Sequence, residues 1–353
     1  APNDVVCTAI EEKLGLHAAP TAALTFGGRD GCIGYLCGQE NQGLAHMFQM
    51  MNSARINTGV SGMALASTAY LNALAYTRER RQGRDLSGRR EGEVPIIAHP
   101  DVRRMLLWMK AMVDGMRSMI YAGAFWADLA SELPDEDQRR HYADLVDFMT
   151  PLIKAYCSDM GFRVCETAMQ CLGGYGYCKD YPIEQYLRDA KIMSLYEGTN
   201  GIQSMDLMGR KMTLKQGACF AAYRREIEKF CEQNRLDEEL GDRVRALAGV
   251  VERLGEAAGE MTARKNADPL LWAASTYPVL MAFGDVTMAW RLLDLAIIAR
   301  PQAAKKGARY DFHRGKVYQA KYFVDITLPH TLATIETCLR PGREVVDMPD
   351  NAF

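Results

Sequence analysis

Residues 170–203, QCLGGYGYCKDYPIEQYLRDAKIMSLYEGTNGIQ, contain two glycine-rich breaks on either side of a short helical segment. The first break, at 173–176, follows the end of a helix, and Pro182 starts the short helix between the breaks. The second break, at 198–201, comes directly after Glu197 and precedes another helix. Such breaks can present backbone N–H groups to an anion, although ordinary helix ends are the simpler interpretation of each one alone.

Long helical segments flank this stretch on both sides. Hydrophobic spacing predicts helices at 44–81, 100–133, 134–172, 182–193, 222–234, 237–265, 270–300 and 312–339, and a further helix after residue 201. Breaks are expected at Pro269, Pro278 and Arg300-Pro301, and the charged residues 84–98 are expected to form an exposed loop.

Two features of these helices predict how they pack. Gly59 and Gly62 lie three residues apart on the first helix, and glycine lowers helix propensity, so we expect them to allow the close approach of a neighbouring helix. The second helix carries a methionine-rich apolar stripe that we expect in the core rather than at a cofactor. The stripe consists of Val102, Met105, Leu106, Met109, Val113, Met116, Met119 and Ile120.

The N-terminal segment differs from the helical remainder. Residues 21–26 and 32–37 predict two short strands around a glycine-rich turn, and no later segment reads as a strand. The fold class is therefore mainly α: a helical bundle with a small β piece at its N-terminus and an extra C-terminal helical unit. The expected domains are the β piece at 1–42, the bundle at 43–213 and the additional helical unit at 214–353.

Composition excludes several classes of protein. The 353 residues are 48% hydrophobic and 24% charged, which is typical of a globular protein and not of a disordered chain or a collagen. The net charge is −2, so no overall basic charge favours nucleic-acid binding, and no apolar run of about 18 residues predicts a membrane span. The ten cysteines include no Cys-x-x-Cys pair, and no His-Glu-x-x-His motif occurs; we expect reduced thiols, a cytoplasmic protein and no metal site.

Three charged residues are candidates for a functional site. Glu197, at the second break, can act as a general base, or it can simply complement the dipole of the following helix. Arg55 is a lone arginine on a largely apolar helix and can pair with a carboxylate or extend to solvent. Arg80 belongs to a basic run at the end of the first helix, where a solvated helix end is the simpler explanation.

Taken together, several sequence blocks resemble the acyl-CoA dehydrogenase family of flavoproteins. They are Cys32-Ile-Gly-Tyr-Leu-Cys continuing to Gln42-Gly-Leu, Met51-Asn-Ser-Ala-Arg-Ile, Tyr76-Thr-Arg-Glu-Arg-Arg-Gln-Gly-Arg, Gln170-Cys-Leu-Gly-Gly-Tyr-Gly-Tyr, and Arg188-Asp-Ala-Lys-Ile leading into Tyr196-Glu-Gly-Thr-Asn-Gly-Ile-Gln. The resemblance covers about residues 20–212. The helical extension beyond about residue 214 is similar to the larger bacterial subfamily that includes 3-methylmercaptopropionyl-CoA dehydrogenase.

The resemblance implies a role for individual positions. Glu197 corresponds to the catalytic base of the family. Arg55, Asn52 and Gly198 correspond to residues near the substrate, and Asn52 stands where many relatives have an aspartate near the CoA. The implied cofactor is FAD, and the implied contacts to it are Arg80, Gln82, Gln170, Gly173, Gly174, Thr199 and Gly201. Some of these contacts reach the FAD of a neighbouring subunit in the family, so the resemblance implies a homodimer or a homotetramer.

The resemblance also implies a reaction, the FAD-dependent α,β-dehydrogenation of an acyl-CoA thioester to the 2-enoyl-CoA. Glu197 is expected to remove the α-proton while a hydride passes from Cβ to flavin N5. An electron-transfer flavoprotein is the implied electron acceptor, and 3-methylmercaptopropionyl-CoA is an expected substrate.

The front of the chain departs from the family pattern. Family members begin with a helical domain and a full β-domain, whereas only the end of a β-domain is recognisable here, so we expect a truncated or proteolysed piece of a longer enzyme. Two alternatives remain open: a flavin-free helical assembly fragment, and a DNA-associated family relative without dehydrogenase activity. Glu197 and the near-neutral charge argue against the second.

Overall fold

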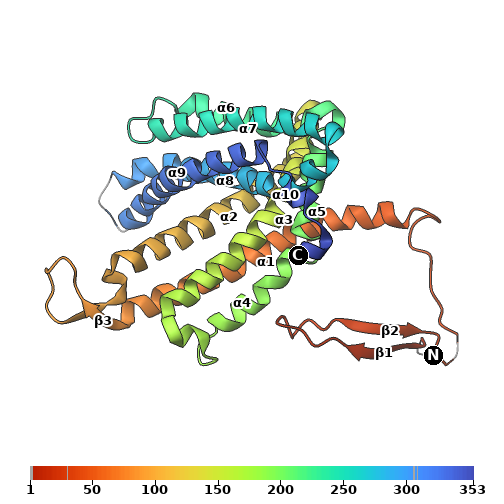
Figure 1. The fold of residues 1–353 in the computed structure, drawn as a ribbon, viewed down its shortest axis with the longest axis horizontal. Helices are drawn as coiled ribbons and strands as arrows, with labels where there is room; N and C mark the ends of the chain where they lie inside the picture. The colour runs from red at the N-terminus through yellow and green to blue at the C-terminus, as the bar shows by residue number, and fades with distance from the viewer. Residues whose placement is uncertain (1–2, 30, 305–306, 308) are drawn as a thin grey trace.

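Long helices make up most of the molecule. The computed structural model describes residues 3–29, 31–304, 307 and 309–353, and Figure 1 shows an array of helices from which a β-hairpin stands apart at the N-terminal end. The long helices are α1 (Gly43–Glu79), α2 (Pro100–Glu132), α3 (Glu136–Leu172), α6 (Ala218–Asn234), α7 (Gly241–Ala267), α8 (Pro269–Ala303) and α9 (Tyr310–Leu339). The short ones are α4 (Ile183–Lys191), α5 (Asn200–Asp206) and α10 (Glu344–Asp347). The predicted mainly α fold is confirmed.

The N-terminal hairpin corrects one prediction. Strand β2 (Ala22–Phe26) lies where a strand was expected, but its partner is β1 (Val5–Ile10), with Val5 opposite Phe26. The prediction of a strand at 32–37 is wrong, because those residues have no regular secondary structure. Residue 30, in the expected turn, lies outside the described residues. The six residues of β1 are rich in Val, Thr and Ile, which favour strands, and this signal was missed.

Two further predictions about local structure are wrong. Residues 84–98 are not simply a loop, since β3 (Arg81–Arg84) pairs antiparallel with β4 (Glu93–Pro95). Glycines 88 and 92 adopt positive φ between these strands, which lets a charged segment reverse direction. The break expected at Pro278 is also absent, since α8 continues through it. Thr276, Val279 and Leu280 around this proline are buried, so packing compensates for the lost backbone hydrogen bond.

Helices α1 and α3 approach each other closely at glycines, as the sequence predicted. A Cβ added at Gly59 would lie 2.6 Å from Ile153 Cγ2, and one added at Gly62 would lie 2.6 Å from the Cys157 carbonyl oxygen. Gly161 of α3 faces the same crossing, since its added Cβ would lie 2.6 Å from the Gly62 carbonyl oxygen. The crossing positions Arg55, which lies on α1 just before these glycines, beside α3.

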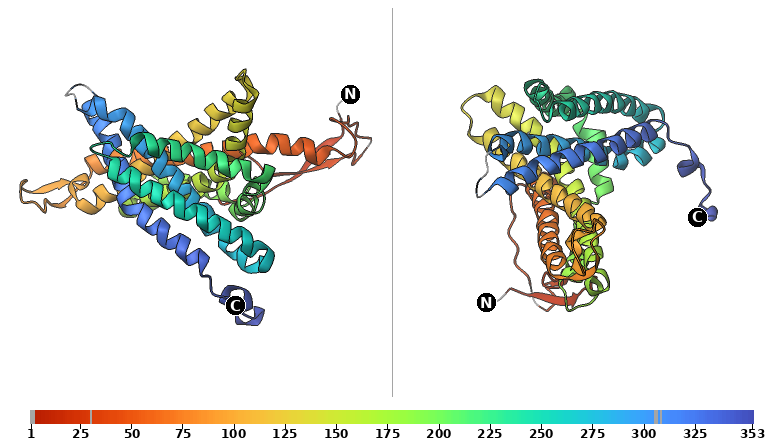
Figure 2. Two further views of the ribbon diagram at one scale, coloured as in Figure 1. Left: turned by 90° about the horizontal axis from the view of Figure 1, so that it is seen from above. Right: turned by 90° about the vertical axis from the view of Figure 1, so that its left-hand side faces the viewer.

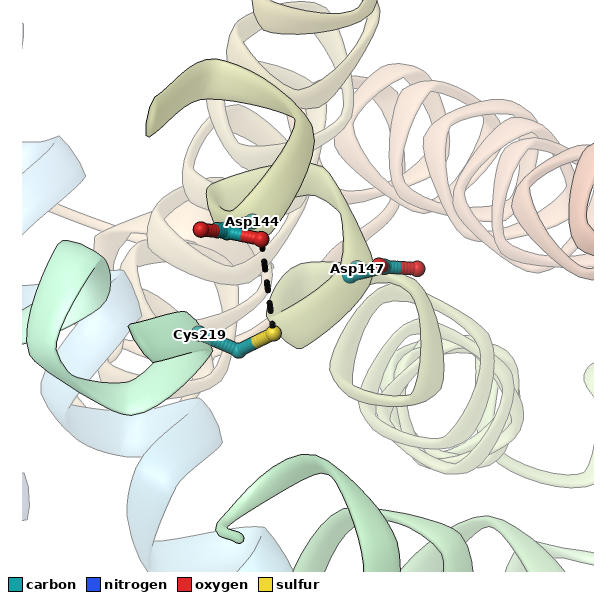
Figure 3. Close-up of side chains that lie close together, drawn as sticks. All are labelled: Asp144, Asp147 and Cys219. Carbon is teal, nitrogen blue, oxygen red and sulfur yellow. Dashed lines mark hydrogen bonds between the residues drawn. The ribbon is translucent and has the colours of Figure 1, made fainter. Parts of the chain in front are cut away.

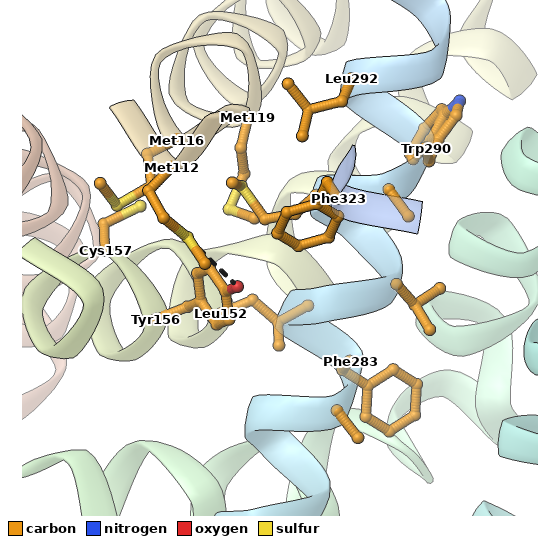
Figure 4. Packing of buried hydrophobic residues seen from close by; sticks show 14 of the residues in the cluster. Met112, Met116, Met119, Leu152, Tyr156, Cys157, Phe283, Trp290, Leu292 and Phe323 are labelled. Carbon is orange, nitrogen blue, oxygen red and sulfur yellow. Dashed lines mark hydrogen bonds between the residues drawn. The ribbon is translucent and has the colours of Figure 1, made fainter. Parts of the chain in front are cut away.

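One hydrophobic core runs through the helical layers. The right-hand view of Figure 2 shows the α6–α7 pair above α8 and α9, with α1, α2 and α4 below them, while α3 extends up to the level of the α6–α7 pair. Met112, Met116 and Met119 of α2 pack with Leu152 and with aromatic residues of α8 and α9 (Figure 4). The predicted methionine stripe is confirmed as core, since its members are buried or packed against the core. The core crosses the boundary expected at 213/214, and the domain division stays a prediction.

The buried contacts include one polar network between the layers. Tyr156 of α3 donates a hydrogen bond to Asp285 Oδ1 of α8 at 2.8 Å, and Thr331 Oγ1 of α9 lies 3.0 Å from the other carboxylate oxygen. Burial raises the pKa of Asp285 to about 6 despite these contacts.

Within the described ranges, no helix is both long enough and apolar enough to cross a membrane.

Candidate active site

Glu197 lies in a tight left-handed turn between two helical segments. Its φ is 58°, and that of Gly198 is 86°. Left-handed backbone is costly for a residue with a side chain, so the surrounding structure must hold Glu197 there. Such strain often occurs at functional positions, where it directs a side chain toward a ligand.

Two side chains hold the backbone of this turn. Gln203 Nε2 donates to the carbonyl oxygens of Glu197 and Gly198 at 3.2 and 3.3 Å. Arg55 Nε approaches the Glu197 carbonyl oxygen from α1 at 3.4 Å. Arg55 is 6% exposed and lies 3.6 Å from the Asp206 carboxylate, so its guanidinium is itself fixed by an ion pair. The predicted neighbours Arg55 and Gly198 therefore lie at Glu197.

Neighbouring side chains hold the backbone of Glu197, but within the part of the chain that the structure describes none of them holds its carboxylate. Across residues 3–29, 31–304, 307 and 309–353, no hydrogen bond or ion pair engages its side-chain oxygens, although the side chain is half-buried. A carboxylate on a fixed turn, with its oxygens unengaged, is suited to accept a proton from a bound molecule.

The remaining residues predicted near Glu197 have simpler surroundings. Thr199 caps α5, since its side chain accepts a hydrogen bond from the Ile202 backbone N–H at 3.3 Å. Gly201 follows in the first turn of α5 and is exposed. Asn52 is exposed on α1, three residues before Arg55, so both lie on a similar face of that helix. The substrate or cofactor roles of these residues stay predictions.

A second group of predicted residues gathers at the other end of the bundle. A cavity of about 600 Å³ is lined by residues from the end of α1, the start of α2 and the end of α3. Its lining includes all five of the predicted cofactor residues that are distant from Glu197: Arg80, Gln82, Gln170, Gly173 and Gly174. The volume lies within the range of small-molecule sites, which is about 300–1,000 Å³.

The chemistry of this cavity suits an aromatic anion. The Arg80 guanidinium lies 5.5 Å from the Tyr175 ring centroid and, among the described residues, has no carboxylate partner. Gly173 has a φ of 61°, and a Cβ added at Gly173 or Gly174 would meet no atom within 4 Å. These two glycines thus leave open space where a ligand can approach the backbone.

The two groups lie far apart on one chain. Arg55 and Arg80 are 25 positions apart in the sequence of α1 and its C-cap, which corresponds to about 37 Å at 1.5 Å per residue. The residues around Glu197 and those around Arg80 therefore line two separate sites.

Comparison with known proteins identifies the family to which the chain belongs. Residues 41–212 match the family described as "Acyl-CoA dehydrogenase, C-terminal domain", and residues 224–349 match "Acetyl-CoA dehydrogenase C-terminal like". A butyryl-CoA dehydrogenase of Syntrophomonas wolfei is 34% identical over 99% of this chain and 59% of its own length. The chain belongs to the acyl-CoA dehydrogenase family. A 3-methylmercaptopropionyl-CoA dehydrogenase of Ruegeria pomeroyi is 38% identical over 92% of this chain and 55% of its own.

Solved structures support the same fold for this acyl-CoA dehydrogenase family chain. Caenorhabditis elegans ACDH-11 in complex with C11-CoA has a TM-score of 0.77 and 19% identity, over 99% of this chain and 55% of its own. An acyl-CoA dehydrogenase from Bacillus anthracis complexed with FAD has a TM-score of 0.72 and 19% identity, over 99% and 58%. The chain thus spans less than two thirds of the length of these relatives.

One cluster of two aspartates and a cysteine has the composition of a metal site. Asp144, Asp147 and Cys219 bring potential ligand atoms within 4.8 Å of one another (Figure 3). Lys215 already pairs with Asp144, and Lys211 Nζ lies 2.8 Å from Asp147 Oδ1. Burial raises the pKa of Cys219 to about 11, so its thiol is protonated at neutral pH and is a poor ligand. In this structure the two carboxylates of the cluster form ion pairs with lysines.

Sequence reasoning missed the residues that support the Glu197 turn. Gln203, Asp206 and Asn200 belong to α5 and its end, and Lys154 lies opposite them on α3. Lys154 is fully buried, and its signal in the sequence is a lone charge in the apolar run from Phe148 to Cys157.

Proposed function

We propose that the chain carries the catalytic base and part of the FAD site of an acyl-CoA dehydrogenase, which oxidises an acyl-CoA thioester to the 2-enoyl-CoA. The observation that carries this proposal is the geometry of Glu197. Its backbone is held by Arg55 and Gln203, while its carboxylate has no partner among the described residues. Family membership supports the same role, because the turn contains the Tyr196-Glu197-Gly198-Thr199 motif.

Glu197 is the proposed acceptor of the proton from the substrate α-carbon. Its fixed turn limits the positions of the carboxylate, which favours proton transfer because little reorganisation is needed. The Glu197 backbone N–H has no hydrogen-bond acceptor among the described residues and is free to polarise the thioester carbonyl. FAD, when bound, supplies the hydride acceptor for this oxidation.

The residues around the 600 Å³ cavity fit the adenosine and pyrophosphate parts of FAD. Arg80 would bind phosphate through its guanidinium, and Tyr175 offers an aromatic face beside it. Gln170, Gly173 and Gly174 would hold the cofactor through an amide side chain and accessible backbone. These residues fit the group because the cavity combines a permanent positive charge with glycines that leave its wall open.

The separation of the two sites supports sharing of the cofactor between subunits. Arg55 and Arg80 are about 37 Å apart along α1. We therefore propose that each chain contributes to two flavin sites of a homodimer or a homotetramer. Glu197 would react with the flavin of one site, and Arg80 would bind the flavin of another. Arg80 would then complete the site of a second copy of the chain.

The proposed substrate is a short acyl-CoA. Relatives are named butyryl-CoA dehydrogenase, at 34% identity, and 3-methylmercaptopropionyl-CoA dehydrogenase, at 38% identity. Both names describe thioesters with a short acyl chain, and we take 3-methylmercaptopropionyl-CoA as the first substrate to test. An electron-transfer flavoprotein is the proposed electron acceptor.

Anaerobic absorbance spectroscopy tests the proposal. The purified protein is incubated with FAD, freed of excess cofactor and titrated with 3-methylmercaptopropionyl-CoA and, separately, with butyryl-CoA. Bleaching of the bound flavin by either thioester is the expected result. A protein that stays colourless would contradict the cofactor proposal, and bound flavin that neither thioester bleaches would contradict the proposed reaction for short acyl chains.

A further inference from the structure

A lysine lies buried behind the turn that carries Glu197. Lys154 is in α3, is fully buried, and has no carboxylate within ion-pair distance in the part of the chain that the structure describes. Its Nζ donates instead to Asn200 Oδ1 at 2.9 Å. Burial of an unpaired ammonium is unfavourable and therefore rare, so its presence at this position calls for a specific role.

Asn200 connects this lysine to the Glu197 turn. It is the first residue of α5, three positions after Glu197, and it is 5% exposed. Its Nδ2 donates to the Ser158 hydroxyl at 3.0 Å and approaches the Ala155 carbonyl oxygen at 3.2 Å. One turn of α3 thus holds Asn200 from both sides of its amide. Because only Gly198 and Thr199 separate Asn200 from Glu197, fixing the amide also fixes one end of the turn.

The charges around Lys154 make it sensitive to pH. Burial lowers the pKa of Lys154 to about 8, and Arg55 of α1 acts in the same direction. Asp159 of α3 and the Glu197 carboxylate oppose this shift. The lysine therefore changes its charge near pH 8, at a position where it interacts electrostatically with both Glu197 and Arg55.

We propose that Lys154 is a positioning residue for Glu197: through Asn200 it holds the left-handed turn, and its ammonium places a positive charge behind the carboxylate. This inference rests on the proposed role of Glu197 as the base. Lys154 does not touch the substrate. It acts by keeping one end of the turn in place, while Gln203 and Arg55 hold the carbonyl oxygens of the turn itself.

The first test measures flavin reduction by acyl-CoA in rapid-mixing experiments with Lys154→Met. We expect the rate to fall about tenfold, typical for loss of precise orientation, with little change in the acyl-CoA concentration that gives half-saturation. We also expect the wild-type rate to decline above about pH 8, as Lys154 loses its charge, and this decline to be absent in the variant. Lys229→Met is the matched control, because it makes the same change at an exposed lysine of α6; it should keep the decline and stay within about twofold of the wild-type rate.

A double-variant comparison tests whether Lys154 acts through Asn200. Asn200→Ala alone should lower the rate about as much as Lys154→Met does. The double variant should be only slightly slower than either single variant, because both changes remove the same link between Lys154 and Asn200. Additive losses in the double variant would overturn the proposal. So would a Lys154→Met protein that reacts at the wild-type rate or keeps the decline above pH 8.

Hydrogen exchange separates this proposal from the proposed function. In the protein without substrate, Lys154→Met should accelerate amide exchange at Ile202 and Gln203, whose N–H groups bond to Thr199 of the turn, and leave α7 unchanged. If Lys154→Met does not fold, Asn200→Ala provides the same measurement without altering a buried charge. Unchanged exchange at Ile202 and Gln203 would overturn the positioning role. A wild-type protein that shows no flavin bleaching would instead contradict the proposed function, and exchange would still decide whether Lys154 holds the turn.

Discussion

Substitution of Gly62 by alanine tests the packing that brings α1 against α3. The added Cβ would lie 2.6 Å from the Cys157 carbonyl oxygen and 3.1 Å from Ser158 Cα. Both atoms belong to the backbone of α3, so no side-chain rotation can relieve the contact. Overpacking of this kind costs about 3 kcal/mol at the upper end of its usual range. Alanine recovers about 1 kcal/mol through its higher helix propensity.

We therefore expect Gly62→Ala to lower the free energy of unfolding by about 2 kcal/mol, measured by denaturant titration with circular dichroism. Gly259→Ala is the matched control, because Gly259 is also inside a helix but is exposed, and its added Cβ would meet no atom within 4 Å. The control should gain about 1 kcal/mol, so that the two alanine variants differ by about 3 kcal/mol. A Gly62→Ala protein as stable as the wild type, or more stable, would refute the reasoning about this crossing.

Three further predictions concern a buried acid, the proposed cofactor cavity and the acidic cluster. Burial raises the pKa of Asp285 to about 6, so the unfolded state ionises first as pH rises from about 4 to 6, and wild-type stability should fall by about 3 kcal/mol over that window. Asp285→Asn should lack this fall in pH-dependent denaturation curves, and a wild-type curve parallel to that of the variant would contradict the assignment. Arg80→Gln should weaken FAD binding about tenfold or more in a fluorescence titration, because it removes a charged hydrogen-bond donor, whereas Arg103→Gln, an exposed change outside that cavity, should not. Divalent cations should leave the melting temperature unchanged, because Lys211 and Lys215 already pair with the acidic cluster; a saturable rise would show that a cation displaces them.

The helical part of the fold could be predicted because it depends on local periodicity. The stripe from Val102 to Ile120 repeats at helical spacing and is core in the structure. Local periodicity could not predict the pairing of β1 with β2. Both strands are short and exposed, so no alternation of buried and exposed residues selects a partner. The break predicted at Pro278 is absent for a related reason. Tertiary burial stabilises the helix around this proline, and local propensity does not include that contribution.

The candidate site also combines residues that a local sequence pattern predicts with residues that only tertiary packing brings together. Glu197 and Gly198 stand out in the sequence because a carboxylate beside a glycine break is a local feature. The contacts of Gln203 and Lys154 depend on the meeting of α1, α3 and α5, which no local pattern specifies. The cofactor residues Arg80 and Gln170 are 90 positions apart in the sequence, and only family resemblance grouped them before the structure placed both at one cavity.

Replacement of Glu197 by glutamine tests the central proposal most directly. Glutamine keeps the size of the side chain but cannot remove a proton, and the Glu197 carboxylate has no partner among the described residues, so the variant should fold and bind FAD as the wild type does. Glu252→Gln, an exposed change on α7, is the control. With a thioester that bleaches the wild-type flavin, we predict that Glu197→Gln reduces its bound flavin about 10³-fold more slowly while Glu252→Gln is unaffected. Flavin reduction by Glu197→Gln at a rate close to that of the wild type would contradict the account.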